Sequence, residues 1–208
     1  MKEKSSADAI LKKLAVLANH NDPINPDLYT KYDVKRGLRN ANGTGVLVGL
    51  TRIGDVVGYK IEDGQKISIP GRLIYRGYDV TDLITDAENN AQFGYEQCAY
   101  LLLFGELPNQ QKLADFSKYL GESRILPANF TEDMIMKAPS NDIMNKIAGG
   151  VLASYSYDPN PEDRSVANIV RQCIELIARF STLAAYGYQA KRRYYDGKSM
   201  FIHNPVPS

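Results

Sequence analysis

The segment from about Glu162 to about Tyr195 constrains the fold more than any other part of this sequence. Its apolar residues recur at helical spacing and cover more than one face of the helix that they predict. They are Val166, Ile169, Val170, Cys173, Ile174, Leu176, Ile177, Phe180, Leu183 and Ala184. A helix that is apolar on several sides needs neighbours on several sides. Since Ala184, Ala185 and Gly187 are small, another helix could approach closely there.

Most of the chain after Gly77 shows the same helical periodicity, interrupted by glycine and proline. These residues mark helix ends, because proline has no amide hydrogen and glycine adopts the left-handed conformation that often follows a last turn. Two earlier helices are expected over residues 5–19 and from Pro26 to Tyr32. The later helices are predicted over residues 81–89 (capped by Thr81 or Asp79), 93–104, 109–121, 128–140 and 142–156.

Residues of about 46–75 have a different character, with short β-favouring pieces between glycines. The pieces read GVLVGL, VVGYKI, KISIP and RLIYRG. Glu62-Asp63-Gly64-Gln65 separates two of them and is a hairpin-turn signal. The sequence therefore predicts a mainly α fold with a small β-hairpin element near the N-terminus.

Charge and composition exclude several classes of function. The 208 residues carry 25 basic and 24 acidic side chains, a net charge of +1, with no block of one sign that would favour nucleic acid. Neither a secretory apolar segment nor an uncharged run of membrane-spanning length is visible, so we expect a cytoplasmic protein. Cys98 and Cys173 lie in apolar helical segments, which predicts reduced core thiols and neither a zinc site nor a redox motif.

No catalytic, cofactor-binding or metal-binding residue can be assigned from motifs. The glycines of Gly43–Gly49 resemble a phosphate loop, but the sequence continues as strand and turn where such a loop must open a helix. His20 and His203 lack neighbours at metal-ligand spacing and an orienting partner for a general base. The G-x-S-x-G signature of a serine nucleophile is absent.

Arginines leave one binding hypothesis open, because their guanidinium groups suit phosphate and carboxylate. The candidates are Arg36, Arg39, Arg72, Arg76, Arg192 and Arg193. Scattered arginines more often form surface ion pairs. Arg192-Arg193 with Tyr194-Tyr195 forms a small basic and aromatic patch, which a helix end with basic residues explains equally well.

Four segments, taken together, resemble the first half of citrate synthases. They are residues 45–53 (GVLVGLTRI), 71–83 (GRLIYRGYDVTDL), 93–108 (FGYEQCAYLLLFGELP) and 176–186 (LIARFSTLAAY), and their order and spacing agree over roughly residues 35–203. The chain departs from the family pattern in three places. It has Ser140-Asn141-Asp142 near the usual His-Pro-Met sequence, Ser181 in place of a proline, and the extra helix at 5–19.

The resemblance implies a mostly helical homodimer that condenses acetyl-CoA with oxaloacetate to citrate and CoA, a step of the tricarboxylic acid cycle, without a metal or other cofactor. In the family an aspartate and two histidines do this acid–base work, and arginines hold the carboxylates. These residues lie in segments that follow the one matching 176–186. Residues 1–208 would then be the N-terminal part of the large domain, with the C-terminal half, which holds the active site and the small domain, absent. We therefore expect an inactive fragment and carry over no catalytic residue.

Two other functions stay open on the sequence alone. The chain could be a non-catalytic helical interaction module derived from such an enzyme, or part of a 2-methylcitrate synthase that uses propionyl-CoA. In each case, the apolar faces of the helix at 162–195 predict either self-association or a groove for further helices, because exposed apolar patches usually mark interfaces.

Overall fold

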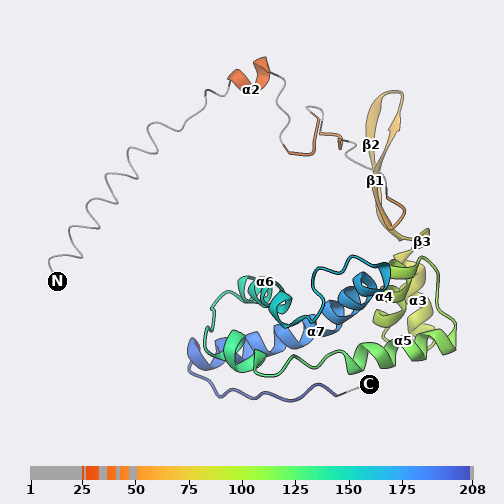
Figure 1. The fold of residues 1–208 in the computed structure, drawn as a ribbon. Coiled ribbons are helices and arrows are strands. Elements are labelled where there is room, and N and C mark those ends of the chain that lie inside the picture. Colours follow the sequence, from red (N-terminus) through yellow and green to blue (C-terminus); the bar gives the residue numbers. More distant parts are fainter. Residues whose placement is uncertain (1–24, 26, 33–36, 41–42, 47–50, 207–208) are drawn as a thin grey trace. The chain divides into compact units, whose positions relative to one another are not determined.

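The computed structural model describes residues 25, 27–32, 37–40, 43–46 and 51–206, which divide into two compact units (Figure 1). One unit comprises residues 1–52 and 56–71, and the other comprises 53–55 and 72–208. The helix expected at 5–19 lies outside the described residues. In the first unit, helix α2 (Asp27–Lys31) confirms the short helix expected after Pro26.

The β element is a three-stranded sheet in the order β1 (Gly54–Glu62), β2 (Gln65–Tyr75) and β3 (Tyr78–Asp79). Asp63 and Gly64 join β1 to β2 with φ angles of 49° and 75°, the left-handed values that tight hairpin turns require. The predicted hairpin turn is therefore confirmed. Among the described residues the first strand begins at Gly54, and residues 47–50, near the expected start of the β element, lie outside them.

Arg76 and Gly77 form the turn between β2 and β3, and both have positive φ angles, of 50° and 91°. Across this turn, Ile74 pairs with Asp79 and Tyr75 with Tyr78 in antiparallel register. The guanidinium of Arg76 donates to the carbonyl oxygen of Leu102 at 2.8 and 3.3 Å. A cation at the end of a helix satisfies its free carbonyls, so this contact fixes the turn against the helix that follows.

Helices make up most of the second unit. They are α3 (Val80–Asn89), α4 (Tyr95–Phe104), α5 (Gln110–Glu122), the π-helix η1 (Thr131–Met136), α6 (Ile143–Ser154), the 3-10 turn η2 (Tyr155–Tyr157) and α7 (Val166–Tyr194). Four of them begin at side-chain caps that accept from backbone N–H groups, namely Asp79, Asn109, Asp142 and Ser165. Such caps satisfy donors that the first turn leaves free. The predicted mainly α fold is confirmed.

The long helix α7 contributes residues to two apolar clusters. The first combines Phe130, Ile135, Leu183, Tyr186 and Ala190, and the second combines Phe116, Leu120, Ile174 and Ala178. The α7 segment therefore supplies buried residues to both clusters, whereas Val166, Ile169 and Phe180, which the sequence places on its apolar faces, are 78%, 45% and 47% exposed.

Several details differ from the sequence-based expectations. Helix α7 begins at Val166, not near Glu162, because Ser165 is extended and caps it. Helix α5 continues through Gly121, which is buried in the helix. Leu152, an apolar residue of the helix predicted over 142–156, is 78% exposed. Cys98 and Cys173 are free thiols, as expected, but both are only half-buried, and burial raises the pKa of the Cys98 thiol.

Candidate functional site

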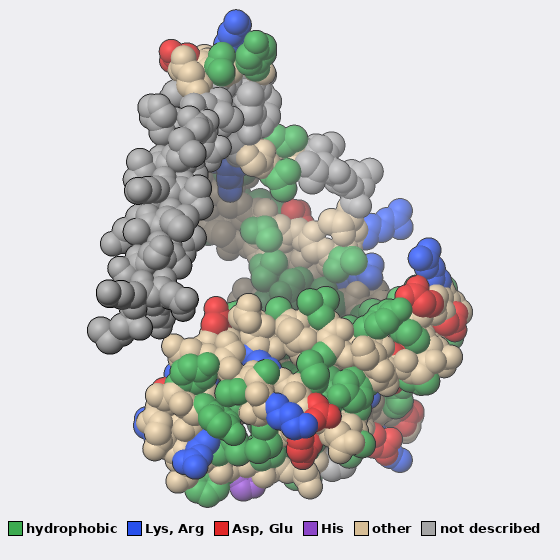
Figure 2. Space-filling model, turned by 60° about the vertical axis from the view of Figure 1, so that its left-hand side comes forward, with side chains coloured by type: hydrophobic (Ala, Val, Ile, Leu, Met, Phe, Trp, Pro, Cys, Tyr) green, Lys and Arg blue, Asp and Glu red, His purple; other side chains and the backbone are tan. Residues whose placement is uncertain are grey.

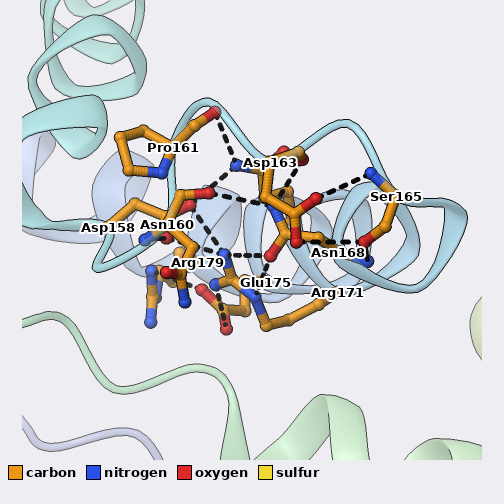
Figure 3. Close-up of polar contacts among 10 residues, drawn as sticks. Asp158, Asn160, Pro161, Asp163, Ser165, Asn168, Arg171, Glu175 and Arg179 are labelled. Atoms are coloured by element: carbon orange, nitrogen blue, oxygen red, sulfur yellow. Dashed lines mark hydrogen bonds and ion pairs between the residues drawn. The ribbon is translucent and has the colours of Figure 1, made fainter.

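A polar cluster joins the loop before α7 to the first half of that helix (Figure 3). Its centre is Arg171. One terminal nitrogen of this side chain contacts both carboxylate oxygens of Asp158, at 2.6 and 2.9 Å. The other terminal nitrogen pairs with Glu175 at 3.0 Å, and Nε donates to the side-chain oxygen of Asn168 at 2.9 Å. Charged donors and acceptors make the stronger class of hydrogen bond, so this guanidinium ties the loop to the helix.

Amide side chains complete the polar cluster. Asn168 is buried and donates to the carbonyl oxygens of Asn160 and Asp163, at 2.9 and 2.8 Å. Gln172 donates to Asp158 at 2.8 Å. The loop carbonyls thus obtain the partners that buried backbone groups require.

The electrostatics of the polar cluster fit a structural role. Partial burial tends to raise the pKa of Asp158, but hydrogen bonds from Asn160 N–H, Gln172 and Arg171 together hold this pKa below its ordinary value. The hydrogen bond to Glu175, followed by the contact with Asp158, raises the pKa of Arg171. Arg171 and Arg179 carry two positive charges, and the carboxylates of Asp158 and Glu175 carry two negative ones. These four groups therefore have no net charge that would attract an ion.

The second candidate is an open hollow of about 560 Å³, which we call the α4–α7 groove. Its wall and floor include Phe93, Tyr95, Arg124, Ser181, Ala185 and Val206. The Arg124 guanidinium lies 3.6 Å from Glu96 and 3.5 Å from the carbonyl oxygen of Val206. Both contacts are long for hydrogen bonds, which average about 2.9 Å for N–H···O. This cation is therefore weakly engaged within the part of the chain that the structure describes.

The segment after α7 forms one rim of the α4–α7 groove. The Tyr186 hydroxyl donates to the carbonyl oxygen of His203 at 2.8 Å, and the Phe201 N–H donates to Gln189 at 3.2 Å. Burial raises the pKa of Tyr186. Ile202 packs against the first apolar cluster. The segment is thus anchored to α7 and brings Pro205 and Val206 to the groove.

His203, the histidine among the described residues, is not part of an acid–base arrangement there. The side chain of His203 is exposed, and only its backbone oxygen is used, by Tyr186. His20 lies outside the described residues. Within the described residues, no group of three or more His, Cys, Asp and Glu side chains could hold a metal ion.

The predicted arginine candidates are dispersed. Arg39 donates to the carbonyl oxygen of Gly43 at 3.1 Å, and Arg72 pairs with Asp79 at 3.0 Å. A hydrogen bond from Thr81 N–H and the contact with Arg72 lower the pKa of Asp79. Arg192 and Arg193 lie in the last turn of α7, where basic residues complement the helix dipole. Arg36 lies outside the described residues.

The glycine-rich segment near residue 43 behaves as a turn where it is described. Arg39 and Gly45 form an isolated antiparallel bridge, and Asn40 N–H donates to the Thr44 carbonyl oxygen at 2.8 Å. Residues 47–50 lie outside the described part. The described turn agrees with the assignment of these glycines to turns.

Sequence reasoning missed the groups that matter most in both candidate sites. Arg171, Glu175 and Arg179 are spaced four residues apart, a pattern that predicts ion pairs on one helix face. That signal was present in the sequence. The position of Arg124 beside Glu96 depends on how α4 packs against the end of α5, and no local pattern reports it.

The described residues define a mainly helical domain with a small antiparallel sheet and an open groove, without an assembled acid–base or metal site. No helix in this described part is long and apolar enough to cross a lipid bilayer. A family model described as "Citrate synthase, C-terminal domain" matches residues 39–205. The chain therefore belongs to the citrate synthase family.

Relatives with assigned names agree with this membership. A citrate synthase from Saccharolobus solfataricus is 28% identical over 175 residues, which are 84% of this chain and 39% of that enzyme. A 2-methylcitrate synthase from Shewanella oneidensis is 33% identical over 124 residues, which are 56% of this chain and 29% of that enzyme. The chain thus spans well under half the length of these relatives.

Solved structures of two citrate synthases are similar to this chain in fold. Citrate synthase from Pyrobaculum aerophilum matches with a TM-score of 0.54 and 25% identity, over 72% of this chain and 35% of that one. A ternary complex of citrate synthase from Thermoplasma acidophilum with carboxymethyl coenzyme A and oxaloacetate matches with a TM-score of 0.58 and 21% identity, over 78% of this chain and 37% of that one.

Proposed function

We propose that this chain provides the N-terminal part of a citrate synthase-type acyltransferase, which condenses acetyl-CoA with oxaloacetate to give citrate and CoA. The observation that carries the proposal is the family match over residues 39–205. The fold likeness to citrate synthases supports it. The proposal keeps the cytoplasmic location and the absence of a cofactor expected from the sequence, with acetyl-CoA as a substrate.

We also propose that the 208-residue chain is inactive by itself. Enolisation of an acyl-CoA needs a base within hydrogen-bond reach of the proton that it removes. The polar cluster uses its carboxylates in ion pairs, and His203 directs only a backbone atom toward a partner. A chain with these groups lacks a free base next to an oxyanion-stabilising donor among its described residues.

The acyl-CoA could also be propionyl-CoA, because the similar relatives include proteins named 2-methylcitrate synthase besides those named citrate synthase. Discrimination between the two substrates amounts to one methylene group, worth about 1–3 kcal/mol in an apolar pocket. Steady-state rates with acetyl-CoA and propionyl-CoA on an active form of the enzyme would separate the two readings.

Self-association is the second part of the proposal. Helices α6 and α7 expose large apolar side chains, including Met144 (74%), Leu152 (78%), Val166 (78%) and Phe180 (47%). Figure 2 shows apolar side chains gathered among polar ones on the described surface. Monomeric proteins rarely leave such patches uncovered, so we propose a homodimer. Light scattering that gives a monomer mass at all concentrations would contradict this part.

The same exposed surface favours the alternative function, a non-catalytic interaction module. The deciding experiment measures CoA release with acetyl-CoA and oxaloacetate, first for the 208-residue chain and then for this chain joined to the complementary part of the Saccharolobus solfataricus enzyme. Turnover by the joined protein supports the enzyme proposal. A folded joined protein without turnover favours the interaction module.

A further inference from the structure

The C-terminal end of α7 carries a basic and aromatic surface that the proposed function does not use. We call it the α7-end patch, and it consists of Tyr188, Arg192, Arg193, Tyr194, Tyr195 and Lys198. Its three tyrosines are 51%, 54% and 53% exposed, in sequence order. The spacing of Tyr188, Arg192 and Tyr195 places them on one helix face. Tyrosine and arginine are among the residue types that most often dominate the energy of protein–protein interfaces.

Three cations of the α7-end patch have no partner within the part of the chain that the structure describes. Arg192, Arg193 and Lys198 form no ion pair and no side-chain hydrogen bond there. The neighbouring Lys191, in contrast, pairs with Asp196 at 3.2 Å. The helix dipole favours basic residues only within the last turn, so it does not account for Lys198, which follows the end of α7. Three positive charges are therefore available to an anionic partner.

Two hydrogen bonds hold the α7-end patch in shape. The Tyr195 hydroxyl donates to the carbonyl oxygen of Pro139 at 3.2 Å and so fixes its ring against the segment between η1 and α6. Gly197, with a φ angle of 64°, turns the chain back, and the Lys198 N–H donates to the carbonyl oxygen of Arg192 at 2.9 Å. A partner thus meets an ordered backbone, which lowers the entropic cost of binding.

The end of α7 offers hydrogen-bond acceptors as well as cations. A helix leaves its last four carbonyl groups without an intrahelical partner. Of these carbonyls in α7, the one that receives another backbone N–H from a described residue is that of Arg192. An acidic polypeptide supplies carboxylates for the arginines and N–H groups for the other carbonyls. A phosphodiester backbone supplies acceptors without donors, so the α7-end patch suits an acidic peptide better than a nucleic acid.

We propose that the α7-end patch binds an acidic segment of another protein, with the carboxylates of that segment paired to Arg192, Arg193 and Lys198. Arginine suits this partner because its planar guanidinium binds a carboxylate through two parallel hydrogen bonds. No residue of the α7-end patch lines the α4–α7 groove or takes part in the polar cluster. The proposal is therefore independent of the acyltransferase function.

The test measures the fluorescence anisotropy of a labelled peptide of alternating Glu and Ser, titrated with the 208-residue chain at low salt, where exposed charges are least screened. The same peptide with Gln in place of Glu is the control probe. The affinity for the Glu peptide should fall by about tenfold in Arg192→Gln/Arg193→Gln, because two charge-assisted contacts are lost. Arg164→Gln/Lys118→Gln removes the same charge from other exposed positions and should bind the Glu peptide as the wild type does.

Lys198→Gln is a second variant, outside α7, and should give a smaller loss of affinity in the same direction. The variants change surface side chains, so their thermal unfolding midpoints should equal that of the wild type. Equal binding of the Glu and Gln peptides, or equal weakening by the two double variants, would overturn the proposal. Tighter binding of a thymidine oligonucleotide of the same length, with the same loss in Arg192→Gln/Arg193→Gln, would overturn it too and assign the α7-end patch to nucleic acid.

Discussion

Helix α7 carries two regions that differ in how completely the chain satisfies them. At its N-terminal half, the polar cluster pairs the Arg171 guanidinium and the Asn168 side chain with groups from residues 158–175, and it leaves Arg179 Nε buried without a hydrogen-bond partner among the described residues. Further along, the α4–α7 groove leaves Phe93 in solvent and Arg124 with long contacts only. The ion pairs of the first region thus join groups that lie close together in the sequence. The second keeps aromatic side chains exposed, as surfaces that bind partners often do.

The two regions also differ in how far apart in the sequence their contacting residues lie. Polar groups that hold a loop on its own helix are local, with partners at most 14 residues apart in the polar cluster. The α4–α7 groove brings together α4, the end of α5, α7 and the segment after it, and it is open to solvent. We expect substitutions in the polar cluster to lower stability. Substitutions in the α4–α7 groove should affect assembly, with little effect on stability.

The largest expected effect lies in the core that supports both regions. Phe130 is completely buried, and its ring lies 5.0 Å from that of Tyr157. Phe130→Ala should lower the free energy of unfolding by about 3–5 kcal/mol, because it removes buried surface and leaves a cavity. Urea denaturation followed by circular dichroism measures this. A loss smaller than that caused by a change in the polar cluster would show that α7 is not held by this apolar core.

Disrupting the polar cluster should have the next largest effect on the free energy of unfolding. Arg171→Ala leaves Asp158 without its cation and should cost about 1–3 kcal/mol of unfolding free energy, since the remaining groups lose hydrogen-bond partners. Arg164→Ala in the same loop is the matched control, because Arg164 is exposed, and it should stay near the wild-type value. Equal stability of the two variants in urea would refute a structural role for the polar cluster.

The pH dependence of stability tests the contribution of the Asp158–Arg171 ion pair. The pKa of Asp158 is lower in the folded chain than its ordinary value, so its ion pair stabilises the fold above that ordinary value. This contribution is lost as the pH falls from near the ordinary value of 3.8 through the folded value. We expect the drop in unfolding free energy below about pH 4 to be shallower in Asp158→Asn. Identical acid profiles of the two proteins would argue against the contribution.

The smallest effect on the free energy of unfolding is expected for a substitution in the α4–α7 groove. Ser181→Ala changes an exposed side chain whose hydroxyl donates only to the carbonyl oxygen of Ala178 in its own helix, at 3.2 Å. Its free energy of unfolding should stay within about 0.5 kcal/mol of the wild-type value, as is usual for surface substitutions. A loss as large as that of Arg171→Ala would mean that the groove is already a packed interior.

The sequence predicted those parts of the fold that depend on local chemistry. Asp79 as a helix cap, Gly105 after α4 and the turn at Asp63-Gly64 each follow from the conformations that these residues favour. The π-helix η1 and the exposure of Leu152 could not be predicted, because both are set by how α6 and α7 pack.

In the candidate sites, too, only contacts between residues close in the sequence could be predicted. The ion pairs within α7 have a readable spacing of four residues, whereas the link from Arg171 to Asp158 crosses the loop and depends on its path. The weak engagement of Arg124 is a tertiary property. The four family-like segments were recognisable together because their order and spacing reflect the whole domain, and the family match over 39–205 confirms that reading.

The central claim is that this chain belongs to an acyl-CoA-condensing enzyme but does not carry the chemistry alone. The most direct measurement is the rate of CoA release from acetyl-CoA in the presence of oxaloacetate, with citrate identified as the product. The account predicts no rate above background for the purified 208-residue chain, and turnover when this chain is joined to the complementary part of the Saccharolobus solfataricus enzyme. Sustained citrate formation by the 208-residue chain alone would contradict it.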